Sequence, residues 1–235
     1  MPKIICVVGD KGGTGKSAWA RGFADVARGL DLCVALFDGD WRARSLFRLF
    51  GQRDEGGRMI PIPQQDPRLG CLPYDVRHRE LGRDLLLNSM AVPRVDILLH
   101  DLPGGFRSDF AQVMSCLDPA VALREFVNAA AEMGFDAVFV TPITPNPTSH
   151  ATALWVAETV RDRAATVAVL NRQYDDGLLA AWIGTEAKTF VETGGLEMTM
   201  PGLDPATFLA IEQFAIRPSV AVGPDDASRC SWVRA

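Results

Sequence analysis

The sequence predicts an α/β protein in which a mostly parallel, twisted sheet lies between two layers of helices. Short apolar patterns typical of strands alternate with helical patterns along almost the whole chain. The strand patterns are apolar throughout, as expected for strands that are covered on both faces. Polar or glycine-rich segments follow four of these strands, and ligands of such sheets bind at the carboxyl ends of the strands.

The elements follow from local patterns. Apolar runs predict strands at residues 3–8, 33–37, 95–101, 137–141, 166–170 and 196–200. Helical periodicity predicts helices at residues 17–29, 41–50, 77–88, 106–117, 119–133, 148–163, 177–192 and 205–216. Asp118 followed by Pro119, for example, is typical of a helix cap and a first-turn proline. Residues 51–73 are rich in glycine, proline and charge, and we expect an irregular surface excursion there.

Composition sets limits on the class of protein. The length of 235 residues suits one domain, which we place at residues 1–221, followed by a C-terminal tail at 222–235. The net charge of −5 argues against a surface coated with basic residues for nucleic acid, although it allows a local basic patch. An odd count of five cysteines and no signal-peptide pattern indicate a reducing cytoplasm.

A glycine-rich loop lies between the first predicted strand and the first predicted helix. It is Gly9-Asp10-Lys11-Gly12-Gly13-Thr14-Gly15-Lys16-Ser17. In this context such a loop binds phosphate, because glycines let backbone N–H groups converge and the helix N-terminus adds partial positive charge. Lys16 is expected to reach the β- and γ-phosphates of a nucleotide, and the Ser17 hydroxyl to ligate Mg²⁺. The predicted phosphate-binding residues are Gly12, Gly13, Thr14, Gly15, Lys16 and Ser17.

Lys11 gives the loop a second lysine, and Lys-Gly-Gly-Thr-Gly-Lys-Ser is the deviant Walker A motif. Through this motif the chain resembles the ParA/MinD family of ATPases, in its small form without an N-terminal DNA-binding extension. The resemblance implies the three-layer P-loop NTPase fold, ATP and Mg²⁺ as cofactors, and a homodimer that forms on ATP binding. It also implies that Lys11 reaches the nucleotide of the other subunit and neutralises transition-state charge, as an arginine finger does. The alternative for Lys11 is a solvated loop lysine.

Three carboxylates follow predicted strands. Asp101 closes an apolar strand before a Pro-Gly turn and is predicted to be a Walker B aspartate that holds Mg²⁺ directly or through water. By the resemblance, Asp38 approaches the Mg²⁺ shell and Asp40 positions or activates the attacking water. Asp40 could also cap the following helix, and the two roles can coexist.

The neighbours of Asp101 are predicted to differ in role. His100 should point to the opposite face of the sheet, and we expect a packed, hydrogen-bonded side chain rather than a catalytic one. Gly104 and Gly105 fit a switch loop that changes shape around the γ-phosphate.

The residues that follow the last two predicted strands are expected to contact the adenine base of the nucleotide. Asn171 and Arg172 follow the fifth strand, and Asn171 resembles the adenine-recognition asparagine of the family, since its amide can both donate and accept. Pro201 and Gly202 follow the next strand, where the family lays backbone against the base. The sequence has no Asn-Lys-x-Asp motif for guanine, so ATP is predicted over GTP.

Partners are less well defined by the sequence. A run of arginines is either a solvated helix face or a contact surface for DNA phosphates or an acidic partner: Arg42, Arg44, Arg48, Arg53 and Arg58. The tail lacks the periodicity of a basic amphipathic helix, so no MinD-type membrane anchor is expected.

The resemblance implies an ATP-dependent dimerising switch that hydrolyses ATP slowly, is stimulated by a protein partner, and positions or partitions a cargo. That cargo could be a plasmid, a chromosome region or a protein assembly. Two alternatives remain at this point: an ATP-coupled metabolic or maturation enzyme of the same superfamily, and a nucleotide-dependent scaffold that hydrolyses little.

Overall fold

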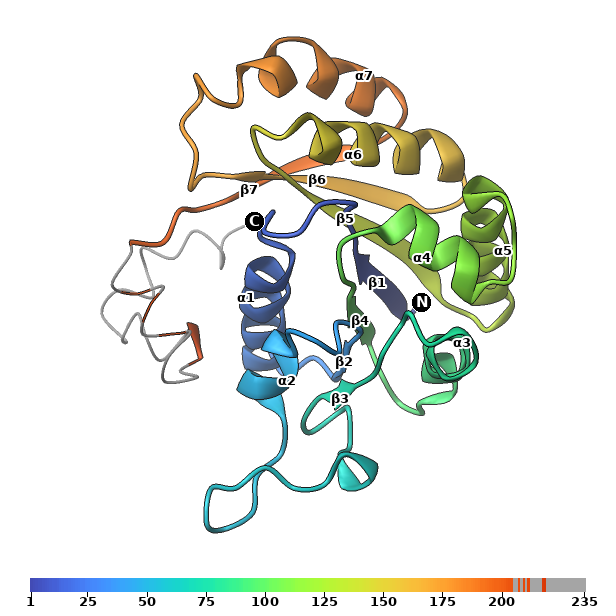
Figure 1. The fold of residues 1–235 in the computed structure, drawn as a ribbon, viewed down its shortest axis with the longest axis vertical. Helices are drawn as coiled ribbons and strands as arrows, with labels where there is room; N and C mark the ends of the chain where they lie inside the picture. The colour runs from blue at the N-terminus through green and yellow to red at the C-terminus, as the bar shows by residue number, and fades with distance from the viewer. Residues whose placement is uncertain (205–206, 208, 210, 212–216, 219–235) are drawn as a thin grey trace.

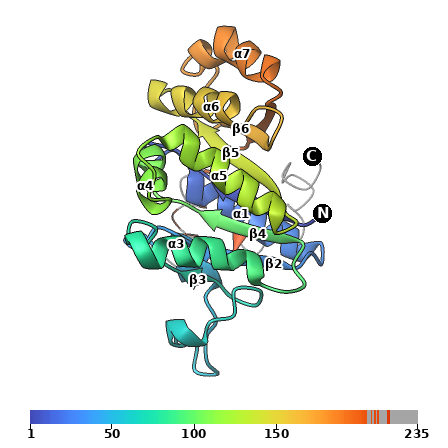
Figure 2. The same ribbon diagram turned by 90° about the vertical axis from the view of Figure 1, so that its right-hand side faces the viewer.

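The computed structural model of this protein describes residues 1–204, 207, 209, 211, 217 and 218. Within these residues, strands form one sheet in the order β3-β2-β4-β1-β5-β6-β7, and every neighbouring pair is parallel. Helices lie on both faces of this sheet (Figures 1 and 2). The predicted fold class is therefore confirmed.

The strands are β1 (Lys3–Val7), β2 (Val34–Asp38), β3 (Leu72–Pro73), β4 (Ile97–Asp101), β5 (Asp136–Ile143), β6 (Ala165–Asn171) and β7 (Leu196–Met200). The α-helices are α1 (Lys16–Gly29), α2 (Ser45–Phe50), α3 (Arg79–Asn88), α4 (Phe106–Val113), α5 (Pro119–Glu132), α6 (Pro147–Val160) and α7 (Ala187–Glu192). Short 3-10 turns occupy Ile62–Gln64 and Ser89–Ala91, and a π-helical turn occupies Trp182–Glu186. Among the described residues, no helix has the length and apolar character needed to cross a membrane.

The core has two main layers because successive side chains of a strand point to opposite faces. Ile4 and Cys6 of β1 pack with apolar residues of α3, α4, α5 and α6. Ile5 and Val7 pack on the other face with α1 and α2. A smaller cluster around Trp182 joins α6 and α7 to β5 and β6.

His100 lies in the first of these layers and is fully buried. Its Nδ1 atom is 2.9 Å from the Tyr74 hydroxyl and its Nε2 atom is 3.0 Å from the Ser89 hydroxyl. The ring stacks on Phe37 with 4.7 Å between ring centroids. Burial lowers the pKa of His100 to about 3, so the ring is neutral at physiological pH, and the expectation of a packed, hydrogen-bonded histidine is confirmed.

The structure differs from the predicted elements where the chain is short or irregular. The predicted excursion at residues 51–73 ends in β3, which pairs with the end of β2. This strand has two residues, one of them a proline, so no periodic pattern marks it, and proline is tolerated there because the strand is at the edge of the sheet. The predicted helix at 41–50 begins only at Ser45, because Arg44 has a left-handed backbone with φ of 47°.

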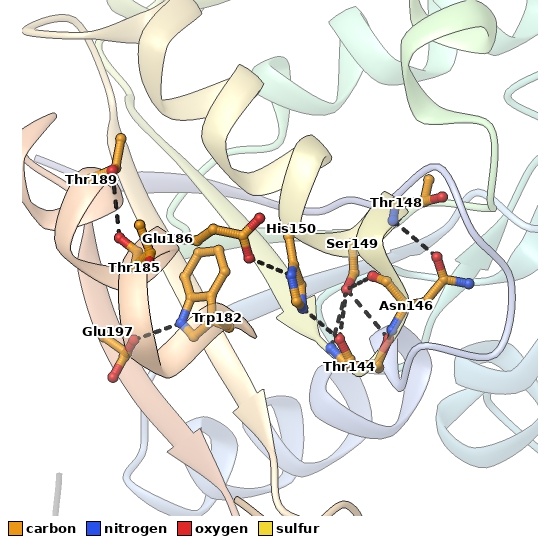
Figure 3. Close-up of polar contacts among 10 residues, drawn as sticks. All are labelled: Thr144, Asn146, Thr148, Ser149, His150, Trp182, Thr185, Glu186, Thr189 and Glu197. Atoms are coloured by element: carbon orange, nitrogen blue, oxygen red, sulfur yellow. Dashed lines mark hydrogen bonds and ion pairs between the residues drawn. The ribbon is translucent and has the colours of Figure 1, made fainter. Parts of the chain in front are cut away.

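The predicted helix at 177–192 begins at Ala180 and contains a π-helical turn, which packs against α6 (Figure 3). His150 on α6 is buried, with its Nε2 atom 2.7 Å from the Thr144 carbonyl and its Nδ1 atom 2.5 Å from Glu186 Oε2. Trp182 packs edge-on against this imidazole, and its indole N–H donates to Glu197 on β7 at 2.8 Å. These contacts tie the segment after β5 to the far edge of the sheet.

Two predictions fall on residues that the structure does not describe. Of the helix predicted at 205–216, only residues 207, 209 and 211 are described. The predicted tail at 222–235, and with it the prediction of no membrane anchor, lies wholly outside the described residues.

Candidate nucleotide-binding site

A cavity of about 810 Å³ opens at the carboxyl ends of the strands. Its walls come from segments far apart in sequence: the phosphate loop (residues 9–17), the loop after β2, the switch loop (residues 102–105) after β4, and the ends of β6 and β7. Several predicted site residues line it, namely Gly12, Gly13, Gly15, Lys16, Ser17, Asp40, Asn171 and Pro201. This volume lies within the usual range for small-molecule sites.

The phosphate loop has the backbone that its glycines allow. Gly13 and Gly15 have left-handed φ angles of 76° and 99°. A Cβ atom on Gly15 would lie 2.9 Å from Asn171 Nδ2 and 3.0 Å from Met200 Cε, so the loop can approach the strand ends only with glycine here. Gly15 caps α1 without a side-chain hydrogen bond. The first N–H groups of this 14-residue helix therefore remain for an anion.

The two lysines of the loop lie in different environments. Lys16 is only 7% exposed, and its ammonium group donates to the Lys11 carbonyl at 3.0 Å. Burial lowers the pKa of Lys16, and the carboxylates of Asp101, Asp40 and Asp10 oppose that shift. Lys11, in contrast, is exposed and does not line the cavity. One lysine thus lies inside the site and the other is accessible from outside.

Asp38 and Asp101 are cross-strand neighbours at the ends of β2 and β4, and both are buried. Asp38 accepts backbone hydrogen bonds from Asp40 at 3.2 Å and from Phe47 at 2.9 Å. Burial, and then the charge of Asp101, raise the pKa of Asp38. The Asp38 carboxylate therefore fixes the loop that carries Asp40 and joins that loop to α2.

Asp101 lacks such partners. Both of its carboxylate oxygens are buried without a hydrogen bond to any described residue. Burial raises the pKa of Asp101, while Ser17 and Lys16 oppose this shift. An unpartnered carboxylate beside a hydroxyl fits a hard divalent cation. Because the described residues contain no group of three His, Cys, Asp or Glu side chains that could hold a metal, further Mg²⁺ ligands would come from Ser17, phosphate oxygens and water.

Replacement of Asp101 by Asn is expected to stabilise the free protein by about 1–3 kcal/mol at pH 8, because it removes a buried charge whose desolvation outweighs the attraction of Lys16. The folded-state pKa of Asp101, about 6, exceeds its unfolded value, so the charge destabilises the fold increasingly as the pH rises from about 4 to 6. The gain should therefore be largest above pH 6 and vanish near pH 4. Urea unfolding of both proteins across this range measures it, and a pH-independent difference, or a loss of stability, would contradict the assignment.

Asp40 lines the cavity while one of its oxygens serves the backbone. Asp40 Oδ1 accepts the N–H groups of Arg42 at 3.2 Å and Ala43 at 3.3 Å. The prediction that Asp40 caps the following helix is wrong, because Arg44 is the N-cap residue of α2 and Asp40 instead caps the turn that precedes it. The other oxygen remains for water, so the catalytic role stays a compatible prediction.

The end of β6 packs directly on the phosphate loop. Asn171 is 8% exposed, donates from Nδ2 to the Thr14 carbonyl at 3.3 Å and accepts the Gln173 N–H at 3.0 Å. Each end of the amide keeps capacity for a further bond to a base. Arg172 and Gly202 do not line the cavity. They pack against each other, since a Cβ atom on Gly202 would lie 2.7 Å from the Arg172 carbonyl.

The interpretation of the arginine run as one helix face is wrong, because only Arg48 lies within α2. Arg44 stacks on Trp41 with 3.5 Å to the ring centroid. Arg53 donates to the carbonyls of Gly57 and Arg48, at 3.1 Å in each case. Contact with DNA or an acidic partner stays a prediction.

Sequence reasoning missed a cluster that joins the switch loop to the phosphate loop. Asp10 accepts the Arg107 N–H at 2.9 Å and the Thr152 hydroxyl at 3.0 Å, and it pairs with the Arg107 guanidinium. The Gly105 N–H donates to the Asp10 carbonyl at 3.0 Å. No sequence pattern predicts these contacts, because the partners are far apart in sequence and only the fold brings them together.

No family model and no curated protein matches the sequence. Solved structures do match. McdA from Cyanthece, in its apo form, superposes with a TM-score of 0.60 at 13% identity, over 100% of this chain and 98% of that one. MinD from Pyrococcus horikoshii, complexed with Mg-ADP, gives 0.55 at 14% identity, over 99% and 93%. The chain has the MinD fold. A chain of the MinC:MinD complex from Aquifex aeolicus gives 0.55 at 19% identity, over 92% and 86%. At these identities the likeness establishes the fold, and it agrees with the resemblance seen in the motif.

Proposed function

We propose that this chain binds MgATP in the cavity and hydrolyses it. One observation carries the proposal: the buried Lys16 lines the cavity within the glycine-rich loop, near enough to the buried Asp101 for their charges to interact, and Asn171 and Pro201 line the same cavity. Phosphates would lie at Lys16, and adenine would lie against Asn171 and Pro201. MinD, whose fold the chain shares, has been solved with Mg-ADP.

Each residue has a distinct task in the proposed reaction. Lys16 leaves the Lys11 carbonyl and donates to the β- and γ-phosphates. Ser17 and Asp101 hold Mg²⁺, which offsets phosphate charge when bound. Asp40, fixed by Asp38 beneath it, orients the attacking water and withdraws its proton.

The exposed Lys11 extends the proposal to a dimer. Lys11 is exposed and does not line its own cavity, so it is available to that of a second copy, where its charge would stabilise the transition state. We therefore infer that ATP binding joins two chains and that hydrolysis separates them. In this proposal the cycle positions or partitions a cargo and responds to a partner protein, for which the MinC:MinD complex offers a precedent.

Steady-state ATPase assays with and without nonspecific DNA test this function and its alternatives. Slow turnover in MgATP that an added partner or DNA accelerates is the expected result. An ATPase rate that is the same with and without DNA would favour an ATP-coupled enzyme. Tight ATP binding without turnover would favour a scaffold and contradict the proposal of hydrolysis.

A further inference from the structure

Arg77 reaches the switch loop from a segment that no motif marks. The segment follows β3 and runs beside the loop that carries Asp40, with Tyr74 N–H donating to the Asp38 carbonyl at 2.8 Å. Helix α3 packs closely upon it, because a Cβ atom on Gly82 would lie 2.6 Å from the Val76 carbonyl. The short edge strand thus delivers Arg77 to the carboxyl end of the sheet.

The guanidinium of Arg77 makes two directed contacts. Its Nη2 atom donates to the Gly104 carbonyl at 2.9 Å, and its Nε atom donates to Asp109 Oδ2 at 2.9 Å. The side chain of Arg77 is 36% exposed and that of Asp109 is 18% exposed. Such a partly buried, two-pronged contact orients its acceptors more firmly than a surface ion pair does.

The contact from Arg77 fixes the position of Gly104 in the switch loop. Gly104 lines the cavity and lies against the phosphate loop, since a Cβ atom there would lie 3.0 Å from the Gly12 nitrogen. The Gly104 carbonyl accepts a hydrogen bond from Arg77, and the N–H group of the next residue, Gly105, donates to the Asp10 carbonyl. The Gly104 N–H has no acceptor among the described residues. The Gly104 N–H is therefore the backbone donor of the switch loop that can bind a ligand in the cavity.

We propose that Arg77, anchored by Asp109, is a positioning residue that holds the Gly104 N–H for the terminal phosphate of ATP and so favours ATP over ADP. Gly104 adjoins Gly12 of the phosphate loop, whereas Asn171 contacts the same loop at Thr14 and Gly15. ADP lacks the phosphate that would meet this N–H group. The inference rests on the proposed nucleotide binding and assigns a new residue to it.

The test compares the affinities of Arg77→Gln, Arg77→Lys and wild type for MgADP and for Mg-ATPγS by calorimetry. Arg83→Gln is the matched control, because Arg83 lies on α3, 41% exposed, and contacts Asp84 on the surface. We expect Arg77→Gln to bind ATPγS about tenfold more weakly, as loss of one charge-assisted phosphate contact would give. Its affinity for ADP should stay within about twofold. Arg77→Lys keeps the charge but loses the fork that contacts Gly104 and Asp109 together, so it should recover only part of the loss.

If Arg77→Gln weakens ADP and ATPγS binding equally, Arg77 has a merely structural role and the inference is overturned. The inference is also overturned if Arg77→Gln binds both nucleotides with the same affinities as Arg83→Gln. If Arg77→Gln does not fold, Asp109→Ala removes the anchor instead and should shift the ratio of ATPγS to ADP affinity in the same direction. Wild-type protein that binds neither nucleotide would refute the proposed function itself. Wild-type binding with an unchanged ratio in the variants would refute this inference alone.

Discussion

Replacement of Lys16 by Ala is expected to weaken MgATP binding at least about 100-fold, equivalent to about 3 kcal/mol. Lys16 is buried at the phosphate end of the cavity, where low dielectric strengthens its attraction to phosphate oxygens. The free variant should remain folded, because burial lowers the pKa of Lys16 and alanine removes a charge that the fold desolvates.

Calorimetric titration with MgATP, together with thermal unfolding of the free proteins, measures both effects. Lys188→Ala is the matched control, since Lys188 lies on α7 and its side chain is 83% exposed. A Lys16→Ala protein that binds MgATP within about threefold of wild type would contradict the assignment.

Replacement of Asp40 by Asn is expected to lower kcat at least about 100-fold, the usual contribution of a general base. The asparagine oxygen can still accept the N–H groups of Arg42 and Ala43, so the turn should keep its shape. Affinity for MgATP should change little, because the lost carboxylate acts on water rather than on phosphate. The variant should therefore accumulate in its ATP-bound state.

A phosphate-release assay and a parallel binding titration separate these two quantities. Glu55→Gln provides the control, because Glu55 is an exposed carboxylate in the loop after α2. Turnover of Asp40→Asn at the wild-type rate would remove Asp40 from the reaction. An equal loss of binding and turnover would instead indicate that Asp40 shapes the cavity.

The sequence predicts those parts of the molecule that depend on local pattern. The order of apolar strand, glycine loop and helix places Lys16 and Ser17 at the first helix, where the structure has them. Parallel pairing then brings the ends of β2 and β4 together, so Asp38 and Asp101 become neighbours as their strand-terminal positions imply. Asn171 meets the phosphate loop for the same reason.

What the sequence does not reveal depends on contacts between distant segments. Strand β3 has too few residues for a period, yet it sets the path of Arg77. The bonds of Asp10 to Arg107 and Thr152 exist only once α4 and α6 are packed. Helix α2 begins later than its pattern predicts because Arg44 has a left-handed backbone. The preceding residues form a turn instead, in which Asp40 accepts the Arg42 N–H.

The most direct measurement is the molar mass of the Asp40→Asn chain in solution by light scattering, in MgATP and in MgADP. We expect twice the chain mass of 25.5 kDa in MgATP and the single-chain mass in MgADP. Adding Lys11→Ala should leave the protein monomeric in MgATP while it still binds the nucleotide, because Lys11 is exposed and Lys16 is retained. A chain that binds MgATP yet stays monomeric, or a Lys11→Ala variant that dimerises equally well, would contradict a site completed by a second copy.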